Sequence, residues 1–238
     1  MIAGANVANE IVEREPDGLM KRTAIRPLPA NRMETPEAIV AMVLMTILGF
    51  FILLLGVNSA AAGLALLSFA LYVFAYTPLK RVGPWCVLVG AIPGAIPAMI
   101  GPVAVNQSIT PLAWLLFGIV FFWQFPHFCA IAWVAKDEYK RAGFKVLSSP
   151  ENPRLLAYQV IVFSLLLFAV SPGLTILGKT GLLYYGASMI LGFLLLAFGL
   201  IFWFRPTQYF AKRLMGAALV YLPSLFLFMI LDRVMLPW

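Results

Sequence analysis

AIVAMVLMTILGFFILLLGVNSAAAGLALLSFALYVFAYTPL, residues 38–79, contains no charged side chain, and this stretch decides the fold class. A transmembrane helix needs about 20 consecutive apolar residues, so the stretch is long enough for two such helices. Gly56, Val57 and Asn58 divide it, because Gly and Asn mark turns between helical segments. The stretch therefore predicts two helices that cross a membrane in succession.

Further charge-free runs continue this pattern at residues 82–135, 155–178, 180–204 and 214–231. The first of them also has room for two helices, which the turn residues 105–108 and Pro111 would separate. A composition of 62% hydrophobic and 11% charged residues excludes an ordinary soluble globule. We expect an all-α, polytopic transmembrane helix bundle with about seven complete spans.

The first residues add a short apolar segment. Met1 to Ile11 is too short to cross a membrane, and it lacks the basic end, apolar core and cleavage site of a signal peptide. We interpret it as the tail of a truncated span, so that residues 1–238 form a single membrane-embedded domain that is incomplete at its N-terminus. A misassigned start codon and a genuine fragment are both compatible with this interpretation.

The distribution of basic residues predicts the orientation. If the spans alternate and the loop before residue 36 is cytoplasmic, all of the 17 Lys and Arg except Lys179 and Arg233 fall on the cytoplasmic side. The positive-inside rule describes such an excess, which accounts for most of the net charge of +7 without a nucleic-acid partner. We therefore expect a multi-pass protein of the plasma membrane, surrounded by the lipid bilayer, with its polar loops in the cytoplasm.

The most polar stretch, residues 9–29 (NEIVEREPDGLMKRTAIRPLP), lies upstream of the apolar runs. Asn9, Glu13 and Asp17 recur every four residues, so on a helix they would project from neighbouring turns of one face. Their oxygen atoms suit a hard divalent cation. Pro16 would interrupt the helix, which places Asp17 just past a break. The spacing predicts a metal site; the alternative is a solvated loop that anchors the membrane helices.

Basic side chains follow this acidic cluster within the same loop. They are Lys21, Arg22, Arg26 and Arg32. Guanidinium and ammonium groups form charge-assisted hydrogen bonds with phosphate oxygens, so these residues could neutralise a phosphate beside the metal site.

The fourth predicted span carries the only histidine of the chain, His127, within Trp-Gln-Phe-Pro-His-Phe at residues 123–128. An ionisable side chain inside a membrane is costly and marks a functional site by default. Haem ligation and proton handling both fit a histidine, although a lone histidine can also be a hydrogen-bonded core residue.

A second acidic pair, Asp137 and Glu138, follows about three helical turns after His127. Diphosphate chemistry can use two acidic clusters that each hold a Mg²⁺ ion against the same leaving group. A solvated helix cap of mixed charge is the alternative interpretation.

These motifs resemble those of a known family. Asn9-x3-Glu13-x3-Asp17-x2-Met-x-Arg-Thr-x2-Arg-Pro-Leu resembles the first motif of the intramembrane prenyltransferases of the UbiA type. Within that superfamily, the Trp-Gln-x-Pro-His-Phe string is highly similar to the signature of the haem O synthases, or protohaem IX farnesyltransferases. The Gly- and Pro-rich residues 90–97 and the string that ends in Lys80-Arg81 are also similar to segments of that family, whereas Pro102 replaces an expected Trp.

The resemblance implies transfer of a farnesyl group from farnesyl diphosphate to a vinyl group of haem B (protohaem IX). The product would be haem O, made in the bacterial inner membrane for haem A synthase or cytochrome oxidase assembly. The resemblance implies Mg²⁺ as cofactor, with these residues as catalytic groups and metal ligands: Asn9, Glu13, Asp17, Asp137 and Glu138. The bases implied to bind the diphosphate are Lys21, Arg22, Arg26, Lys80, Arg81 and Lys136. Those implied to bind haem are His127, Gln124 and Trp123.

Three alternatives remain. The nearest is a UbiA-type enzyme with another aromatic or polyprenol acceptor, and the Trp-Gln-x-Pro-His-Phe string argues against it. A small-solute transporter would be favoured by ionisable groups at mid-membrane in several helices, whereas His127 stands alone in the predicted spans. A non-catalytic membrane fragment is the third, and the short first segment is compatible with it.

Overall fold

The computed structural model describes residues 1–145 and 153–235, and within these ranges the regular elements are all helical. Seven stretches of the described chain are long and apolar enough to cross a membrane, as expected. They comprise α3 (Thr35–Gly56), α4 (Ser59–Ala70) continued by η1 (Leu71–Tyr76) and α5 (Thr77–Val82), α6 (Trp85–Asn106), α7 (Pro111–Val134), α9 (Pro153–Val170) with α10 (Gly173–Ile176), α11 (Leu182–Phe204) and α12 (Gln208–Met235). The short helices outside these spans are α1 (Ile2–Val12), α2 (Arg14–Gly18) and α8 (Lys136–Arg141). The chain is therefore an all-α, multi-pass integral membrane protein.

The helices form two compact units. Unit 1 comprises Met1–Ile109 and Ala135–Val146, and unit 2 comprises Thr110–Val134 and Leu147–Trp238. Unit 1 thus contains both acidic motifs, while unit 2 contains the histidine motif. That the two units work as a single domain stays a prediction.

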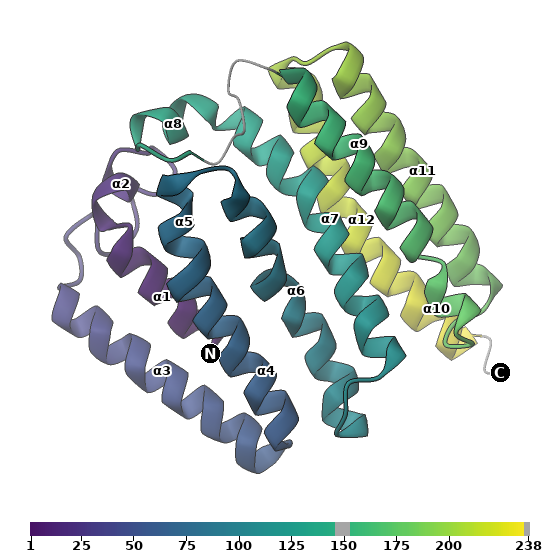
Figure 1. The fold of residues 1–238 in the computed structure, drawn as a ribbon, viewed down its shortest axis with the longest axis horizontal. Helices are drawn as coiled ribbons and strands as arrows, with labels where there is room; N and C mark the ends of the chain where they lie inside the picture. Colours follow the sequence, from purple (N-terminus) through teal and green to yellow (C-terminus); the bar gives the residue numbers. More distant parts are fainter. Residues whose placement is uncertain (146–152, 236–238) are drawn as a thin grey trace. The chain divides into compact units, whose positions relative to one another are not determined.

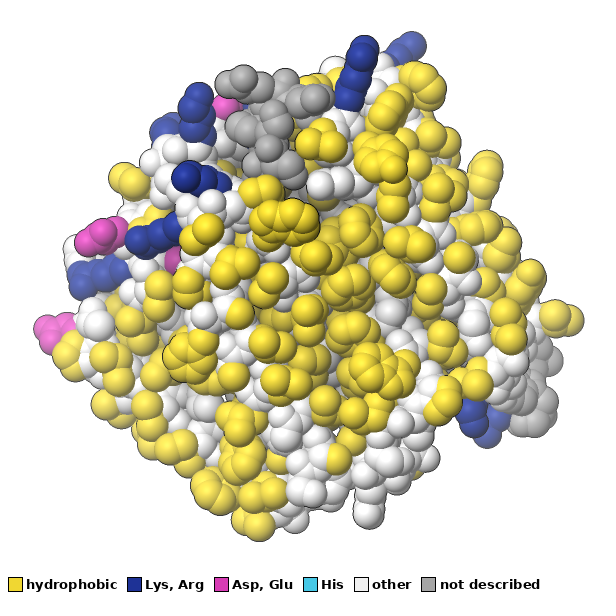
Figure 2. All heavy atoms as spheres, in the orientation of Figure 1, with side chains coloured by type: hydrophobic (Ala, Val, Ile, Leu, Met, Phe, Trp, Pro, Cys, Tyr) yellow, Lys and Arg dark blue, Asp and Glu magenta, His cyan; other side chains and the backbone are white. Residues whose placement is uncertain are grey.

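The helix faces of this protein expose many apolar side chains, as expected for a surface in contact with lipid. Hydrophobic side chains cover much of the visible helix faces, and in unit 1 the charged side chains gather around α2 and α8 (Figure 2). Along α3 the exposed apolar residues include Leu44, Leu48 and Leu55, at 62%, 63% and 82% exposure. Exposure of large apolar residues at this level would be a liability in water and is ordinary in a bilayer.

Unit 1 is built on α1, α3, α4 and α6. α1 packs against α3, α3 against α4, and α4 with η1 against α6 (Figure 1). Asn58 joins two of these helices, because its Oδ1 accepts from the Ala61 N–H at 2.8 Å and so caps α4. Its Nδ2 lies 3.1 Å from the carbonyl oxygens of both Val103 and Ala104 in α6. A single side chain therefore fixes the start of α4 to the end of α6.

α6 contains Pro93, Pro97 and Pro102 and still forms one helix. Pro97 has no N–H, so the carbonyl of Pro93 lacks its usual helical partner. The hydroxyl of Ser68 in α4 donates to that carbonyl at 2.8 Å. Neighbouring helices commonly satisfy the backbone groups that proline releases in a membrane, and here the bond also ties α4 to α6.

Gly90 allows η1 to approach α6 closely. A Cβ atom placed on Gly90 would collide with the ring of Tyr76. Gly90→Val is therefore expected to lower the free energy of unfolding by about 1–3 kcal/mol, because the ring or the helix must shift. Thermal unfolding in detergent measures the effect. Gly101→Val is the matched control in the same helix, since nothing lies within 4 Å of its added Cβ. Equal midpoints for the two variants would contradict the packing argument.

Unit 2 is a group of four long helices. α7 contacts α9 and α12, and α11 contacts the same two helices (Figure 1). Phe125 of α7 stacks on Phe163 of α9 with ring centroids 3.5 Å apart. The indole N–H of Trp123 donates to the carbonyl of Ala218 in α12 at 2.6 Å. These contacts hold the helix that carries His127 between its two neighbours.

A buried carboxylate closes one end of unit 2. Asp232 of α12 is fully buried. It accepts hydrogen bonds from backbone N–H groups at the start of α11, those of Gly181, Leu183 and Tyr184, the last two at 3.1 and 3.2 Å. The first N–H groups of a helix have no intrahelical partner, so Asp232 caps α11 from another helix. We did not predict this residue, because the expected span ended at Leu231.

Candidate active site

The first polar motif lies at a break between α1 and α2. Pro16 has no N–H and its ring crowds the carbonyl one turn back, so the Val12 carbonyl loses its helical partner. α1 ends at Val12, and Glu13 has φ −100° and ψ 12° before α2 begins. The guanidinium of Arg81 donates to the released Val12 carbonyl at 3.4 Å. The expected break is present, but it lies at Glu13, one turn before Pro16.

Asn9 and Glu13 share one cation, the ammonium of Lys80 from α5. Lys80 Nζ lies 2.9 and 3.0 Å from the two carboxylate oxygens of Glu13 and 3.1 Å from Asn9 Oδ1. Asn9 Nδ2 in turn donates to Glu13 Oε2 at 2.9 Å. Asn9 and Glu13 are 5% and 3% exposed. Charges buried to this degree persist only when they are paired and hydrogen-bonded, so the three side chains form one coupled group.

The π-helical segment η1 leads directly into this group. Thr77 Oγ1 lies 2.9 Å from the Tyr72 carbonyl oxygen and 3.1 Å from Asn9 Oδ1. Thr77 and Lys80 are three residues apart on α5, so they share a helix face, and both reach Asn9. π-helical turns are rare and often occur at functional sites. Thr77 was not among the predicted site residues, although its three-residue spacing from Lys80 was a usable signal.

Asp17 is paired with a different cation. Arg26 Nη1 donates to Asp17 Oδ2 at 2.7 Å, and Arg26 Nε lies 3.7 Å from Glu10 Oε1. The Thr23 hydroxyl donates to the Asp17 carbonyl at 2.9 Å and fixes the turn after α2. Burial would lower the pKa of Arg26, but its hydrogen bond and charge contact with Asp17, helped by two further carboxylates, raise that pKa. Arg26 is therefore held as a cation beside Asp17.

The oxygen atoms of this cluster suit a hard divalent cation. Asp17 is fully buried, and its Oδ1 has no hydrogen-bond partner among the described residues. A buried carboxylate oxygen without a partner is costly unless a ligand satisfies it. With Glu13 and the amide oxygen of Asn9, the donors are all oxygen atoms, which Mg²⁺ prefers. The residues fit this ion, although no three His, Cys, Asp or Glu side chains gather into one cluster within residues 1–145 and 153–235.

The second acidic pair lies in the same unit, in the first turn of α8. The Lys145 N–H donates to the Lys80 carbonyl at 2.8 Å and fixes the segment after α8 to the end of α5. Burial raises the pKa of Tyr139 on α8, and charges of the first motif act on it as well. Asp137 is exposed and Glu138 is partly exposed. The structure thus brings this pair near the first motif but outside the buried cluster.

The predicted diphosphate-binding bases divide into two groups. Lys80 and Arg26 lie inside the cluster, as described above. The others lie at its edge or on the surface, where water also reaches them: Lys21, Arg22 and Arg81, which are exposed, and Lys136, which is partly exposed.

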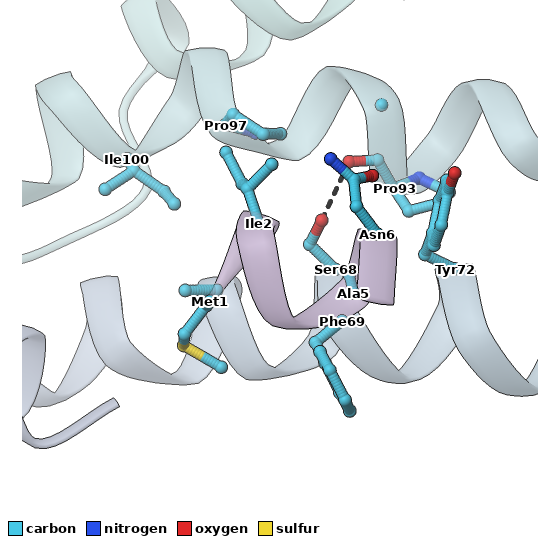
Figure 3. Close-up of a pocket in the computed structure, with 12 residues that line it drawn as sticks. Met1, Ile2, Ala5, Asn6, Ser68, Phe69, Tyr72, Pro93, Pro97 and Ile100 are labelled. Carbon is cyan, nitrogen blue, oxygen red and sulfur yellow. Dashed lines mark hydrogen bonds between the residues drawn. The ribbon is translucent and has the colours of Figure 1, made fainter. Parts of the chain in front are cut away.

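An apolar cavity of about 250 Å³ lies among α1, α4, η1 and α6. Figure 3 shows Met1 and Ile100 at one end of it and Asn6 and Tyr72 at the other. The remaining lining residues are Ile2, Ala5, Ala65, Ser68, Phe69, Pro93, Gly94 and Pro97. We did not predict this cavity from the sequence, because α1 and α4 supply its walls together with the Gly- and Pro-rich segment of α6.

One end of the cavity adjoins the acidic cluster. Asn6 and Asn9 are three residues apart on α1 and therefore share a helix face. Tyr72 lines the cavity, while its carbonyl accepts from Thr77, the residue that also contacts Asn9. A charged cluster beside an apolar cavity suits an amphiphile with an anionic head and a hydrocarbon tail.

The histidine motif lies on α7 in unit 2. The rings of Trp123 and His127 are stacked, with centroids 5.0 Å apart and an interplanar angle of 12°. His127 Nδ1 is buried and has no hydrogen-bond partner among the described residues. Gln124 is buried, and its Nε2 donates to the Val120 carbonyl at 3.3 Å. A buried ring nitrogen without a partner calls for a ligand, and both haem ligation and proton transfer would use it.

Known proteins are similar in sequence to this chain along nearly its whole length. Residues 1–230 match the model of the UbiA prenyltransferase family. A protein of Solibacter usitatus called protoheme IX farnesyltransferase is 40% identical over 232 residues, which cover 97% of this chain and 80% of that protein. The protein of that name from Koribacter versatilis is 37% identical over 248 residues, covering 98% and 78%. That of Thermus thermophilus is 36% identical over 235 residues, covering 98% of this chain and 39% of the longer relative.

The fold is also known from a solved structure, described as concerning digeranylgeranylglyceryl phosphate synthase in membranes. The two chains superpose with a TM-score of 0.80 at 19% sequence identity, covering 98% of this chain and 82% of that one. At this identity the likeness shows the fold alone, and it agrees with the helix bundle expected from the sequence. Together with the family match over residues 1–230, these findings show that the chain belongs to the UbiA prenyltransferase family.

Proposed function

We propose that this prenyltransferase transfers the farnesyl group of farnesyl diphosphate to a vinyl carbon of haem B and so makes haem O. The relatives that cover nearly the whole chain carry the name protoheme IX farnesyltransferase. The observation that carries the proposal is the buried acidic cluster beside an apolar cavity, which suits a prenyl diphosphate. In the reaction the allylic C–O bond breaks and diphosphate departs with the bonding electrons, while a C–C bond forms to the vinyl group. Water then adds to the resulting carbocation and loses a proton, which leaves a hydroxyl group.

The diphosphate would bind at the break between α1 and α2. Asn9, Glu13 and Asp17 would hold a Mg²⁺ ion, which supplies positive charge to stabilise the departing diphosphate. Lys80 and Arg26 lie against these side chains and carry N–H groups that phosphate oxygens accept. Once the metal ion and the diphosphate are bound, these charges are fixed against the leaving group, so little reorganisation is needed as negative charge develops.

The segment around α8 would complete the diphosphate site. Asp137 and Glu138 are proposed to hold a second Mg²⁺ ion on the exposed side of the cluster, because their helix is fixed to α5 through Lys145. The bases at the edge of the cluster and on the surface would attract the polyanionic substrate from solution; they are the exposed Lys21, Arg22 and Arg81 and the partly exposed Lys136.

The farnesyl tail would lie in the cavity among α1, α4 and α6. Its walls are almost entirely apolar, and the Ser68 hydroxyl that faces it is already bonded to Pro93. The Ser68 hydroxyl therefore stays satisfied when hydrocarbon fills the cavity, and the polar side chains of Asn6 and Tyr72 lie at the end beside the acidic cluster. An apolar chamber also keeps water away from the allylic carbon until the acceptor is in place.

His127, with Trp123 and Gln124, is proposed to bind haem B. The support is the buried, unpartnered Nδ1 of His127 and the flat Trp123 ring stacked beside it. His127→Ala is expected to shift the Soret band of bound haem B, because loss of an axial imidazole changes the electronic structure of the iron. The spectrum of the purified protein with added haem B measures this.

The control for His127 is Trp114→Ala, which removes a 57% exposed aromatic side chain from the start of the same helix. Its haem spectrum should equal that of the wild type. Identical spectra for His127→Ala and the wild type would exclude His127 as the axial ligand and leave proton handling as its role.

The proposed location is the bacterial inner membrane, with the acidic cluster on the cytoplasmic side. The bases of unit 1 accompany the ends of α2, α5 and α8, which the positive-inside rule assigns to the cytoplasm. Haem O would pass from there to haem A synthase or to cytochrome oxidase assembly.

The test is to express the chain in a host that lacks haem O synthesis and to analyse the extracted haems by chromatography. Formation of haem O that depends on the chain supports the proposal. Stable, inserted protein without haem O would overturn it and favour a UbiA-type enzyme with another aromatic or polyprenol acceptor.

A further inference from the structure

We propose that Lys80 is an internal substitute cation: its ammonium occupies the position between Asn9 and Glu13 that a divalent cation needs, and it moves to the diphosphate when metal and diphosphate bind together. The inference rests on the proposed diphosphate chemistry. It goes beyond that chemistry by making Lys80 the group that couples the binding of metal to the binding of diphosphate.

Lys80 and a metal ion would compete for the same oxygen atoms. Both carboxylate oxygens of Glu13 and the Oδ1 of Asn9 lie within 2.9–3.1 Å of Lys80 Nζ. These are the atoms through which Glu13 and Asn9 would ligate a metal ion. Two cations a few ångströms apart in a partly buried site repel each other strongly, so the metal and the ammonium cannot share this position.

The displaced ammonium has a place close to the site. Lys80 has a flexible four-carbon stem, and its Nζ lies 4.6 Å from the centre of the Tyr76 ring and 5.9 Å from that of Phe144. Aromatic faces attract a cation, so Lys80 can leave Glu13 and remain close to the site. Thr77 keeps its own contact with Asn9, which holds the amide in position during the exchange.

The pairing of charges makes the binding of metal and the binding of diphosphate depend on each other. A metal ion that binds alone would displace Lys80 from Glu13 without giving its ammonium a new anionic partner. Diphosphate that binds alone would draw Lys80 away and leave the buried carboxylate of Glu13 unpaired, which is costly. Only the two ligands together pair every charge, so each should strengthen the binding of the other, and by the same factor.

The experiment uses the purified full chain in detergent with Mn²⁺ and inorganic pyrophosphate as probes. Electron paramagnetic resonance measures free Mn²⁺, and calorimetry measures binding of the preformed Mn²⁺–pyrophosphate complex. In Lys80→Met we expect Mn²⁺ alone to bind about 10-fold more tightly than in the wild type, and the complex to bind about 10-fold more weakly. A purely structural role would weaken both, and a residue that only binds diphosphate would leave Mn²⁺ affinity unchanged.

Two further variants secure the interpretation. Lys140→Met makes the same charge change at an exposed site of α8, and it should bind both probes as the wild type does. Lys80→Gln removes the charge but keeps an N–H donor on a shorter polar side chain, so it protects the test against misfolding of Lys80→Met. Mn²⁺ affinity equal to or below that of the wild type in the folded Lys80 variants overturns the inference. The inference is also overturned if the wild-type protein binds Mn²⁺ with the same affinity in the presence and in the absence of pyrophosphate.

The haem O assay separates this inference from the proposed function. If Lys80→Met changes the affinities for Mn²⁺ and for the Mn²⁺–pyrophosphate complex in opposite directions but the chain makes no haem O, the exchange at Lys80 stands. Haem B as the acceptor is then overturned. Haem O formation with unchanged Mn²⁺ binding in the Lys80 variants would overturn the exchange alone.

Discussion

Asp17→Asn is expected to lower kcat for haem O formation by a factor of about 100–1,000, the usual cost of losing one charge-stabilising group. Asp17 is fully buried, with one carboxylate oxygen 2.7 Å from Arg26 and the other without a partner among the described residues. Asn keeps the volume and an oxygen atom for Arg26, but it removes the negative charge that would hold a metal against the diphosphate. Single-turnover formation of haem O by the purified protein measures the effect.

The matched control is Glu15→Gln, which removes an exposed carboxylate from the same short helix, α2. Its turnover should stay close to that of the wild type. Asp17→Asn should still bind haem B with the wild-type absorption spectrum, which would show that the protein is folded. More than a third of the wild-type kcat in Asp17→Asn would refute the assignment of Asp17 as a metal ligand.

Asp232→Ala is expected to lower the free energy of unfolding by about 3 kcal/mol. Each buried N–H left without an acceptor costs roughly 1–3 kcal/mol, and Asp232 accepts from three of them at the start of α11. Local relaxation of α11 should recover part of this cost. The measurement is thermal or denaturant unfolding in detergent, followed by the loss of helical signal.

Asp232→Asn supplies the comparison for this prediction. Its amide keeps one oxygen for Leu183 and Tyr184, which both donate to Oδ1, but it places an NH₂ group against the N–H of Gly181. The loss of stability should therefore be intermediate. Unfolding of Asp232→Ala at the wild-type midpoint would show that the carboxylate does not support α11.

The membrane spans could be predicted from the sequence because each is a charge-free run long enough to cross a bilayer. Gly56 and Asn58 separate the first two spans as expected, and Asn58 caps α4. The rule failed at the end of α12, where it stopped at Leu231. Asp232 continues the helix because its charge is used by N–H groups of another helix, and a pattern along one segment does not contain that partner.

The candidate site was also predictable only in part, because a pattern along one segment does not show its partners from other helices. The four-residue spacing predicted that Asn9 and Glu13 share a helix face, and the structure bonds them to each other. The partner that pairs with both, Lys80, is 71 residues from Asn9. Its position depends on the packing of α1 against η1, the segment that leads into α5. The cavity was even harder to predict from the sequence, because three helices that are separate in the sequence build its walls. The catalytic and metal-binding roles of these residues stay predictions.

The π-helical segment at Leu71–Tyr76 also affects how this chain should be aligned with its relatives. A π-helical turn holds one residue more than the α-helical turn it replaces. A relative with a regular α-helix here would be one residue shorter over the same rise, and an alignment without a gap would match Lys80 to the wrong position. One position corresponds to about 100° around a helix, which is enough to point the side chain away from Asn9. Comparisons of this span should therefore allow a single-residue gap between Leu71 and Thr77.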